Sequence, residues 1–392
     1  MMHCLEGLRV IDVTQNLAGP FCTQILGDLG ADVIKVEPPG AGDSARAWGP
    51  PFWEGESPLF LATNRNKRSI QLDLKSPEGA ETLQELIAGA DVFVQSFRSG
   101  RAEALGLGYE AVSALETGIV YVSVTAYGSE GPLSHLPGYD PLMQAAGGIM
   151  SVTGQPDGPP ARVGGSVVDL GTGMWAALGV LAALRDRDAT GRGCHVETSL
   201  LGSALTWMGY HMIGHLATGE VPGPMGSGIS MIAPYEAFPT ADGHIMINAG
   251  NDATFGRLTE ALGLDELADD ERFADNPSRV ENRQALFDSI AGKTRTLEAG
   301  ELLELLYRHN VPCAPIQDVA QVVGDPQVAA TGMLRAAEHP RIDDYRDVAM
   351  PIRWNGEQAE FRVHPPGPGE HTREVLAELE AARKDTHGKE IP

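Results

Sequence analysis

The amino-acid sequence predicts an α/β protein whose large domain is a doubly wound, Rossmann-like sheet and whose second domain is smaller and α+β. Short apolar segments typical of buried strands alternate with helical segments over about the first 200 residues. This alternation indicates a parallel sheet with helices on both faces. The predicted parts are residues 1–217 (large domain), 218–232 (linker), 233–318 (small domain) and 319–392 (a C-terminal segment that returns to the large domain).

The chain opens with a predicted βαβ unit. Residues 8–13 and 32–37 have the apolar pattern of buried strands. Between them Ala18-Gly19-Pro20 is expected to open a helix over Phe21 to Leu29, because Pro is tolerated in the first turn of a helix and Gly30 can end one. The intervening turn, TQNLAGP, lacks the G-x-G-x-x-G pattern. A classical dinucleotide site is therefore not predicted.

The same alternation continues through the large domain. Ser76 is a good N-cap for a helix that runs to Ile87. Ligands of doubly wound sheets bind beyond the carboxyl ends of the strands, so the segments that follow the strands are the expected site. The further strands are predicted at 69–74, 91–95, 119–124 and 195–199, and the segments at strand ends are 14–20, 38–53, 75, 96–100 and 125–139.

The second domain is predicted from a change of pattern. Two short apolar segments within 233–250 flank Asp242-Gly243, a strong hairpin signal. Helical patterns follow, and a last helix is expected near the C-terminus. The predicted helices are 253–262, 282–294, 302–309 and 372–384.

Composition excludes several classes of function. The chain of 392 residues carries 29 basic and 53 acidic residues, a net charge of −24. This charge argues against nucleic-acid partners and against an anionic membrane surface. The four cysteines are far apart, so neither a zinc knuckle nor a disulfide framework is indicated. With no secretory signal and no apolar run of about 18 residues, we expect a cytoplasmic protein without a membrane span.

Two clusters of polar residues could bind a metal or an anion. His211 and His215 have helical i, i+4 spacing but lack an H-E-x-x-H pattern and a third ligand, so no metal site is predicted. Residues 64–69, NRNKRS, place three cations in one short segment. These cations could contact phosphates, together with Lys75 and Arg98, or could be ordinary surface charge. The sequence leaves both alternatives open.

One acidic residue, Asp169, lies between a Gly-rich run at 147–165 and an apolar helical segment at 170–184. In the first turn of a helix, its carboxylate would face free backbone N–H groups and the positive end of the helix dipole. Such a carboxylate could be a nucleophile. However, Ser166 and Asp169 also fit a capping box. By itself this local pattern favours the capping role.

Several longer segments change that balance. Their order and spacing together resemble the class III CoA-transferases, the group that includes formyl-CoA transferase, carnitine CoA-transferase and the α-methylacyl-CoA racemases. The resemblance covers nearly the whole chain. The matching segments are 7–43, 64–79, 138–169, 190–200, 282–284, 311–316 and 325–328.

The resemblance implies a CoA-transferase with Asp169 as its nucleophile. In such transferases the carboxylate attacks an acyl-CoA thioester to give a mixed anhydride, and the released CoA then forms an aspartyl-CoA thioester. An aspartate with an ordinary pKa of about 3.9 would be ionised at neutral pH and need no general base. The oxyanion would need N–H donors. The Gly-rich loops that could supply them contain Gly164, Gly165, Asn248, Ala249 and Gly250.

The resemblance also implies where CoA binds, although the chain departs from the formyl-CoA enzyme. It has Leu17 in place of a Gln, Pro38 in place of an Arg, and 248–251 in place of a poly-Gly loop. These departures argue against oxalate and formyl-CoA as substrates. Trp48 matches a tryptophan of the substrate pocket. The expected CoA contacts are Leu17, Ala18, Leu72, Asp73, Lys75, Ser96, Phe97, Arg98, Tyr139 and Asp140.

Two alternatives to transfer are kept. The racemase branch pairs the matching Asp with a His in a GHD motif, but here Tyr139 replaces that His. A group with an ordinary pKa of about 10 is a poor base near neutrality, so transfer is favoured. The chain could also be a non-catalytic scaffold that binds acyl-CoA. The resemblance further implies an interlocked homodimer of two rings, with acyl-CoA (succinyl-CoA as a first guess) and a carboxylic acid as substrates and no metal.

Overall fold

The protein consists of two compact units in the computed structural model, which describes residues 4–388. One unit contains the chain up to Gly148, Val163–Met212 and the part from Gln327 onward. The other contains Ile149–Arg162 and Ile213–Pro326. The boundaries differ in detail from those expected. The short segment Ile149–Arg162 belongs to the second unit, and the boundary between Met212 and Ile213 falls inside the helix Gly209–Thr218.

The first unit is built on a six-stranded parallel sheet, as the alternating pattern predicted. The strand order is β3-β2-β1-β4-β5-β6, and every neighbouring pair is parallel. This order reverses direction between β1 and β4, as in doubly wound nucleotide-binding sheets. The strands are β1 (Arg9–Asp12), β2 (Asp32–Glu37), β3 (Lys67–Gln71), β4 (Val92–Gln95), β5 (Val120–Thr125) and β6 (Cys194–Ser199).

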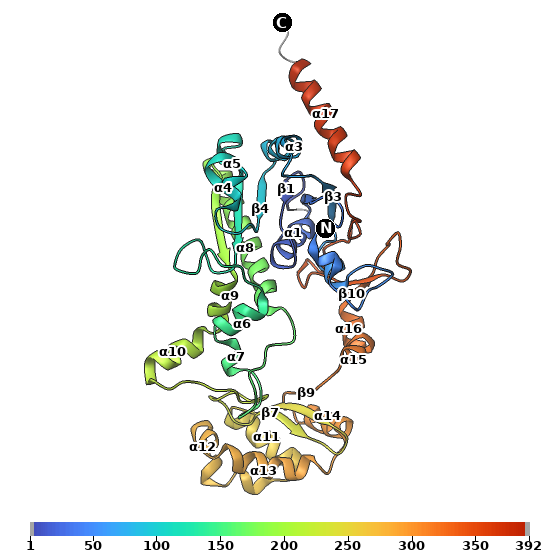
Figure 1. Cartoon of the computed structure of the whole chain (residues 1–392). Coiled ribbons are helices and arrows are strands. Elements are labelled where there is room, and N and C mark those ends of the chain that lie inside the picture. The colour runs from blue at the N-terminus through green and yellow to red at the C-terminus, as the bar shows by residue number, and fades with distance from the viewer. Residues whose placement is uncertain (1–3, 389–392) are drawn as a thin grey trace. The chain divides into compact units, whose positions relative to one another are not determined.

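Helices connect these strands and cover both faces of the sheet (Figure 1). Most begin and end near the predicted residues, and the Ser76 hydroxyl accepts a hydrogen bond from the N–H of Gly79, so the expected N-cap is confirmed. The helices of this part are α1 (Ala18–Asp28), η1 (Ser44–Ala47), α2 (Pro58–Leu61), α3 (Pro77–Ala88), α4 (Arg101–Ala104), α5 (Tyr109–Leu115), α6 (Asp140–Ala146), α8 (Val167–Thr190) and α9 (Leu200–Trp207).

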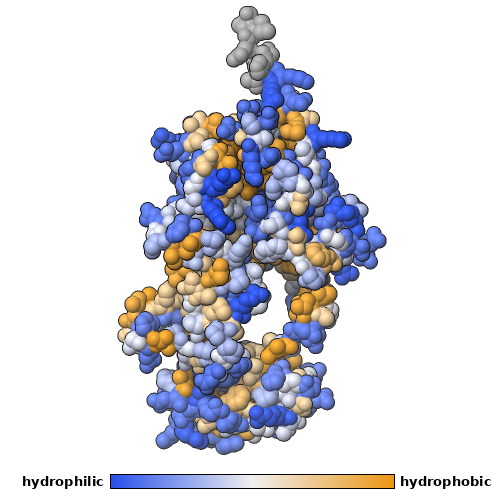
Figure 2. All heavy atoms as spheres, in the orientation of Figure 1, coloured by the Kyte–Doolittle hydropathy of each residue, from blue (hydrophilic) through white to orange (hydrophobic). Residues whose placement is uncertain are grey.

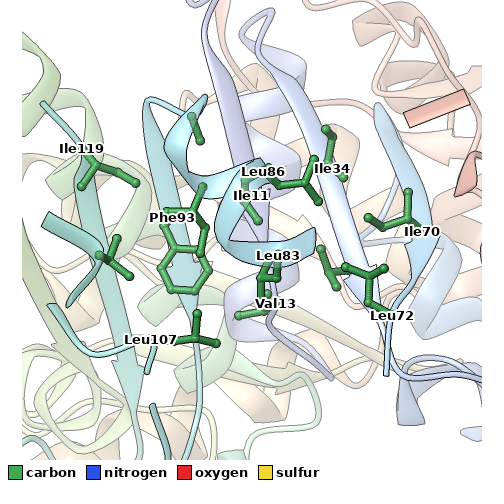
Figure 3. Packing of buried hydrophobic residues seen from close by; sticks show 14 of the residues in the cluster. Ile11, Val13, Ile34, Ile70, Leu72, Leu83, Leu86, Phe93, Leu107 and Ile119 are labelled. Atoms are coloured by element: carbon green, nitrogen blue, oxygen red, sulfur yellow. The ribbon is translucent and has the colours of Figure 1, made fainter. Parts of the chain in front are cut away.

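One face of the sheet packs against α3 and α5. Figure 3 shows Leu83 and Leu86 of α3 over side chains from neighbouring strands, among them Ile11, Ile34 and Phe93. All five are at most 1% exposed. Because side chains alternate along a strand, these apolar residues leave the intervening positions to the opposite face.

The opposite face packs against α1 and α8. The two helices approach closely at Gly173, where an added Cβ would lie 2.6 Å from the carbonyl oxygen of Ala18. Only glycine fits such a contact. Helix α8 is also long and apolar enough to cross a membrane, and half of its apolar stretch is buried inside the protein.

The C-terminal part of the first unit returns to the sheet. Its last helix, α17 (Thr372–Gly388), places Val375 in the same core as α3 and α5. The other elements are α16 (Pro326–Thr331), at the division between the units, and the short strands β10 (Leu334–Ala336), β11 (Arg346–Val348), β12 (Arg353–Trp354) and β13 (Glu357–Gln358).

The second unit has an antiparallel sheet in the order β7-β8-β9. Strands β7 (Tyr235–Pro239) and β8 (His244–Asn248) form the hairpin that Asp242-Gly243 predicted, closed by a hydrogen bond from Thr240 N to Gly243 O. Its other elements are β9 (Cys313–Pro315), α7 (Ile149–Val152), α11 (Asp252–Leu262), η2 (Asp265–Leu267), η3 (Glu271–Phe273), α12 (Asn276–Glu281), α13 (Arg283–Thr294), α14 (Ala299–Arg308) and α15 (Val319–Gly324), and α10 (Gly209–Thr218) spans the division.

The cationic segment 64–69 is neither a phosphate site nor ordinary surface charge, so both open alternatives are wrong. Arg65 forms buried ion pairs with Asp28 and Asp347, at 2.6 and 2.9 Å. Lys67 is likewise buried and bonded within the fold. Arg68 binds carboxylates of β2 and α17. The three cations therefore tie the C-terminal segment and α1 to the sheet.

Candidate active site

A cleft of about 190 Å³ lies in the first unit, beyond the carboxyl ends of the parallel strands. Loops that follow β1, β4 and β5 line it, and β1 and β4 are the pair where the strand order reverses. This is the position where doubly wound sheets bind ligands. A second cavity of about 390 Å³ shares five lining residues with the first, and it extends to Arg98 and Arg101.

Asp169 lines this cleft from the first turn of α8, as predicted. The helix runs between β5 and β6, so its N-terminus lies at the carboxyl edge of the sheet. The predicted capping box is wrong, because Ser166 is the N-cap residue but its side chain makes no capping hydrogen bond. Asp169 is therefore not occupied in capping its own helix.

Asp140 caps α8 instead. Its Oδ2 accepts hydrogen bonds from the N–H groups of Val168, at 2.8 Å, and of Asp169, at 3.2 Å. Gln144 donates to the other carboxylate oxygen at 2.6 Å. Asp140 is 1% exposed and does not line the cleft. Its role in this structure is to hold the backbone of Asp169.

Burial raises the pKa of Asp169 from 3.8 to about 7, and the negative charge of Asp140 adds to that shift. Among residues 4–388, no side chain or backbone group donates a hydrogen bond to the Asp169 carboxylate. The expectation of an ordinary aspartate, fully ionised at neutral pH, is therefore not met in the unliganded protein. Asp169 is a half-buried carboxyl group that can exchange its proton near neutral pH.

The N-terminus of α1 lines the same cleft. The N–H groups of Ala18 and Gly19 belong to its first turn, and in the part of the chain that the structure describes neither has a partner. Such N–H groups attract negative charge. Because Gly173 lies one turn after Asp169 and touches Ala18, the carboxylate and these donors share one side of the cleft.

The structure brings together most of the predicted CoA contacts. Leu17, Ala18, Ser96, Phe97, Arg98 and Tyr139 all line the cleft with Asp169. Trp48 and Tyr139 are both partly exposed, with ring centroids 6.3 Å apart.

Four predicted contacts lie outside the cleft, among them Asp140, which caps α8. Leu72 is 8% exposed and belongs to the core under α3, whereas Asp73 and Lys75 are exposed in the turn before that helix. The Asp73 carboxylate accepts a hydrogen bond from the N–H of Lys75. Their contact with CoA stays a prediction.

The two loops expected to stabilise the oxyanion differ in whether their backbone N–H groups are already hydrogen-bonded. Gly164 and Gly165 are exposed, and among residues 4–388 their N–H groups have no partner. In the second unit, the N–H groups of Asn248, Ala249 and Gly250 donate to Pro312 O, Pro234 O and the side chain of Asn248. That loop would have to rearrange before its backbone could stabilise an oxyanion.

Sequence reasoning missed several lining residues. Gln15 and Asn16 extend the loop after β1, and Arg101 begins the short helix after β4. Leu136 and Pro137 add an apolar wall. The segments at strand ends contained most of these positions, but no pattern within the segments distinguished them from other loop residues.

Comparison with known proteins decides the family. The model of CoA-transferase family III matches residues 5–372. The chain belongs to CoA-transferase family III. A family member from Mus musculus, succinyl-CoA:glutarate CoA-transferase, is 38% identical over 96% of this chain and 87% of its own length. A second, succinate–glutarate CoA-transferase of Agrobacterium fabrum, is 39% identical over 97% of this chain and 96% of its own length.

A solved family structure has the same fold. The crystal structure of a CAIB/BAIF family protein from Brucella suis matches with a TM-score of 0.85 and 39% identity, and it covers 96% of this chain and 99% of that one. The protein is therefore an enzyme that transfers CoA, and the resemblance found in the sequence is confirmed. Its substrates are CoA thioesters and carboxylic acids.

Proposed function

We propose that this family III enzyme moves CoA from succinyl-CoA to a dicarboxylic acid, with Asp169 as the covalent nucleophile. The observation that carries the proposal is a half-buried carboxyl group in a cleft at the carboxyl edge of the sheet, which the N-terminus of α1 also lines. Among residues 4–388 nothing donates a hydrogen bond to this carboxyl group, and the N–H groups of Ala18 and Gly19 have no partner. Both relatives described above carry succinate or succinyl-CoA and glutarate in their names. Glutarate is a dicarboxylate, which supports that class of acceptor.

The chemistry needs only groups that the chain and the substrates supply. An Asp169 oxygen attacks the thioester carbonyl, and the C–S bond breaks. The CoA thiolate departs, and a mixed anhydride of Asp169 and succinate is formed. The thiolate attacks Cγ of Asp169, which releases succinate and forms an aspartyl-CoA thioester. An acceptor carboxylate then attacks Cγ, the Cγ–S bond breaks, and a second mixed anhydride and the CoA thiolate are formed. The thiolate attacks the acceptor carbonyl of this anhydride, whose bond to the Asp169 oxygen breaks. The new acyl-CoA leaves, and the carboxylate of Asp169 is restored.

Each attack produces a tetrahedral oxyanion. The free N–H groups of Ala18 and Gly19, at the positive end of α1, are donors of the kind that stabilise such an anion. Gly164 and Gly165 offer further N–H groups just before α8. Arg98, with Arg101 in the adjoining cavity, carries the positive charge that the phosphates of CoA require.

The raised pKa of Asp169 has a consequence for the pH dependence of the reaction. Only the carboxylate form attacks, so kcat/KM should fall about tenfold per pH unit below the free-enzyme pKa. Because that pKa is about 7, the fall should begin near neutrality. An aspartate with an ordinary pKa would keep the reaction rate constant down to about pH 5.

The covalent intermediate is the direct test. The enzyme is incubated with succinyl-CoA, glutaryl-CoA, acetyl-CoA or oxalyl-CoA, quenched with hydroxylamine, and digested for mass spectrometry. We expect succinyl-CoA to yield a hydroxamate on the peptide that carries Asp169, and Asp169→Asn to yield none. Asp188→Asn, an exposed change near the other end of α8, is the matched control and should keep the adduct.

The same incubation in deuterated water distinguishes transfer from isomerisation. A transferase forms the adduct and leaves the α-carbon unlabelled. Deuterium at the α-carbon of a 2-methylacyl-CoA, without an adduct from any donor, would overturn the proposed route. CoA binding without either reaction would favour the scaffold.

We also propose that the enzyme is a homodimer, the assembly that the family resemblance implied. Large apolar side chains are exposed along α8 and α10, among them Leu178 at 56%, Ile213 at 66% and Leu216 at 78%. Figure 2 shows apolar atoms on the surface of α10. Exposed clusters of this kind support a partner surface. Light scattering should give twice the chain mass of 41.6 kDa, and Leu216→Glu should lower it.

A further inference from the structure

Four buried charges lie directly beneath the loop Thr14–Pro20. Asp12 ends β1, Lys35 lies in β2, and Lys67 begins β3, so three neighbouring strands contribute to one cluster on the α1 face of the sheet. Asp43 adds the second carboxylate from the segment after β2. All four side chains are at most 1% exposed. The cluster is neutral as a whole, with two cations and two carboxylates.

Lys35 and Asp43 hold the first half of the loop. The Lys35 ammonium donates to the carbonyl oxygen of Thr14 at 2.9 Å, and it pairs with Asp43 at 2.8 Å. Asp43 in turn accepts a hydrogen bond from the N–H of Asn16 at 3.0 Å. Asn16 has a φ of 67°, in the left-handed region that few residues other than Gly and Asn adopt. The exposed hydroxyl of Ser44 also binds the Asn16 side chain.

Asp12 and Lys67 hold both ends of the loop Thr14–Pro20. Asp12 accepts hydrogen bonds from the N–H and hydroxyl of Thr14 and from the hydroxyl of Thr23 in α1. Lys67 donates to the carbonyl oxygen of Pro20 at 2.8 Å and pairs with Asp12 at 3.2 Å. The N–H and carbonyl groups of Thr14 at the start of the loop, and the carbonyl group of Pro20 at its end, are therefore bonded to buried charges.

What lies between these anchors is the wall of the cleft. Residues Gln15 to Gly19 all line it together with Asp169, and within residues 4–388 the N–H groups of Ala18 and Gly19 have no partner. The charged side chains themselves do not line the cleft. Their effect on a ligand must pass through the backbone of the loop.

We propose that Lys35 and Asp43 are positioning residues for acyl-CoA: through Thr14 and Asn16 they fix the backbone of residues 15–19 against the thioester. The inference rests on the proposed function, because it assumes that acyl-CoA occupies this cleft. Lys35 and Asp43 contact no substrate atom. They set the direction of N–H groups for which a displacement of about 1 Å can cost a hundredfold in rate.

A second buried ion pair in the same unit provides the matched control. Arg65 and Asp347 pair at 2.9 Å and are 4% and 6% exposed, but neither touches the Thr14–Pro20 loop or the cleft. Removal of Asp43 takes the ion-pair partner from Lys35, and removal of Asp347 takes one of two partners from Arg65, which keeps Asp28. Both changes weaken a buried ion pair and should lower the unfolding midpoint. Only substitutions of Lys35 or Asp43 should also slow adduct formation on Asp169 and weaken saturation by succinyl-CoA.

The test uses four variants of the full chain: Lys35→Met, Asp43→Asn, Ser44→Ala and the control Asp347→Asn. The rate of adduct formation on Asp169 is measured against succinyl-CoA concentration, well below each unfolding midpoint, per folded protein. Amide hydrogen exchange of the 13–20 peptide is measured on the same samples without ligand. Ser44 is exposed, so its variant keeps the test open if a buried change prevents folding.

We expect Lys35→Met and Asp43→Asn to slow adduct formation about tenfold to a hundredfold, to weaken saturation by succinyl-CoA, and to speed exchange in the 13–20 peptide. Ser44→Ala should show the same changes at a few-fold. Asp347→Asn should lower only the unfolding midpoint. Adduct formation within twofold of the unchanged protein in Asp43→Asn and Ser44→Ala would overturn the inference, as would equal losses in Asp347→Asn.

Failure of the proposed function has a different signature. In that case the unchanged protein itself forms no adduct. Hydrogen exchange still decides whether the network fixes the loop, because it needs no ligand: unchanged exchange at residues 13–20 in both Asp43→Asn and Ser44→Ala would overturn the positioning role.

Discussion

Replacement of Asp169 by Asn should stabilise the unliganded protein above pH 7, although it removes the proposed nucleophile. The reason is electrostatic. Burial and the charge of Asp140 raise the pKa of Asp169 from 3.8 to about 7 in the folded state. Folding therefore holds a proton on Asp169 between these two values, and above pH 7 the folded protein must carry the carboxylate in an unfavourable place. Asn carries no charge at any pH.

The magnitude follows from the size of the shift. A difference of about 3 pKa units at about 1.36 kcal/mol each corresponds to roughly 4 kcal/mol as an upper limit. Partial exposure of Asp169 and burial of the new amide reduce this to an expected gain of about 2–3 kcal/mol. For a unit of this size each kcal/mol changes Tm by about 2 °C. The variant should then melt roughly 5 °C higher at pH 8.

The size of the effect changes systematically with pH, which makes the assay specific. Below pH 4 the carboxyl group is protonated in both folded and unfolded states, so the Tm difference between Asp169→Asn and the unchanged protein should vanish. It should grow as the pH rises and level off above pH 7. Scanning calorimetry from pH 4 to 8, with Asp188→Asn as the exposed control, measures this. A Tm difference that stays the same at every pH would refute the reasoning.

Three further predictions concern the support of Asp169 and of the second unit. Asp140→Asn removes a charge that raises the pKa of Asp169, so the fall of kcat/KM at acid pH should move to lower pH; an unmoved profile would contradict this. Gly173→Ala places a Cβ 2.6 Å from the Ala18 carbonyl oxygen, and adduct formation should drop at least tenfold; a rate within twofold would show that the two helices can separate without loss. Arg279 is fully buried and donates to Ala233, Phe273 and Gly250 carbonyls, so Arg279→Met should destabilise the second unit by about 3–5 kcal/mol, measured by urea unfolding.

Local patterns predicted the elements well where one strand or helix carries its own signal. The strand at 32–37 and the hairpin at Asp242-Gly243 were predicted at their observed places. Asp169 was expected in the first turn of a helix and is found there. These features depend on residues close together in the chain, namely an apolar period, a turn dipeptide and a run of glycines before a helix.

Roles that depend on distant residues were predicted less well. The capping box at Ser166 was wrong because Asp140, 28 residues before Val168, supplies the cap. The cationic segment 64–69 was misjudged because its partners Asp28 and Asp347 come from α1 and from the C-terminal segment. No local pattern shows that a cation will be buried, since burial depends on what the rest of the chain packs over it.

The sequence by itself determined the order of strands and helices, the family resemblance and the choice of Asp169, since all three are carried by residue types at fixed spacing. The tertiary structure decided the chemical state of that residue. Its pKa of about 7 depends on burial and on Asp140, and its backbone N–H is held by the Asp140 carboxylate. The physical reason is that a pKa depends on distances in space and on exclusion of water, which the linear chain does not state.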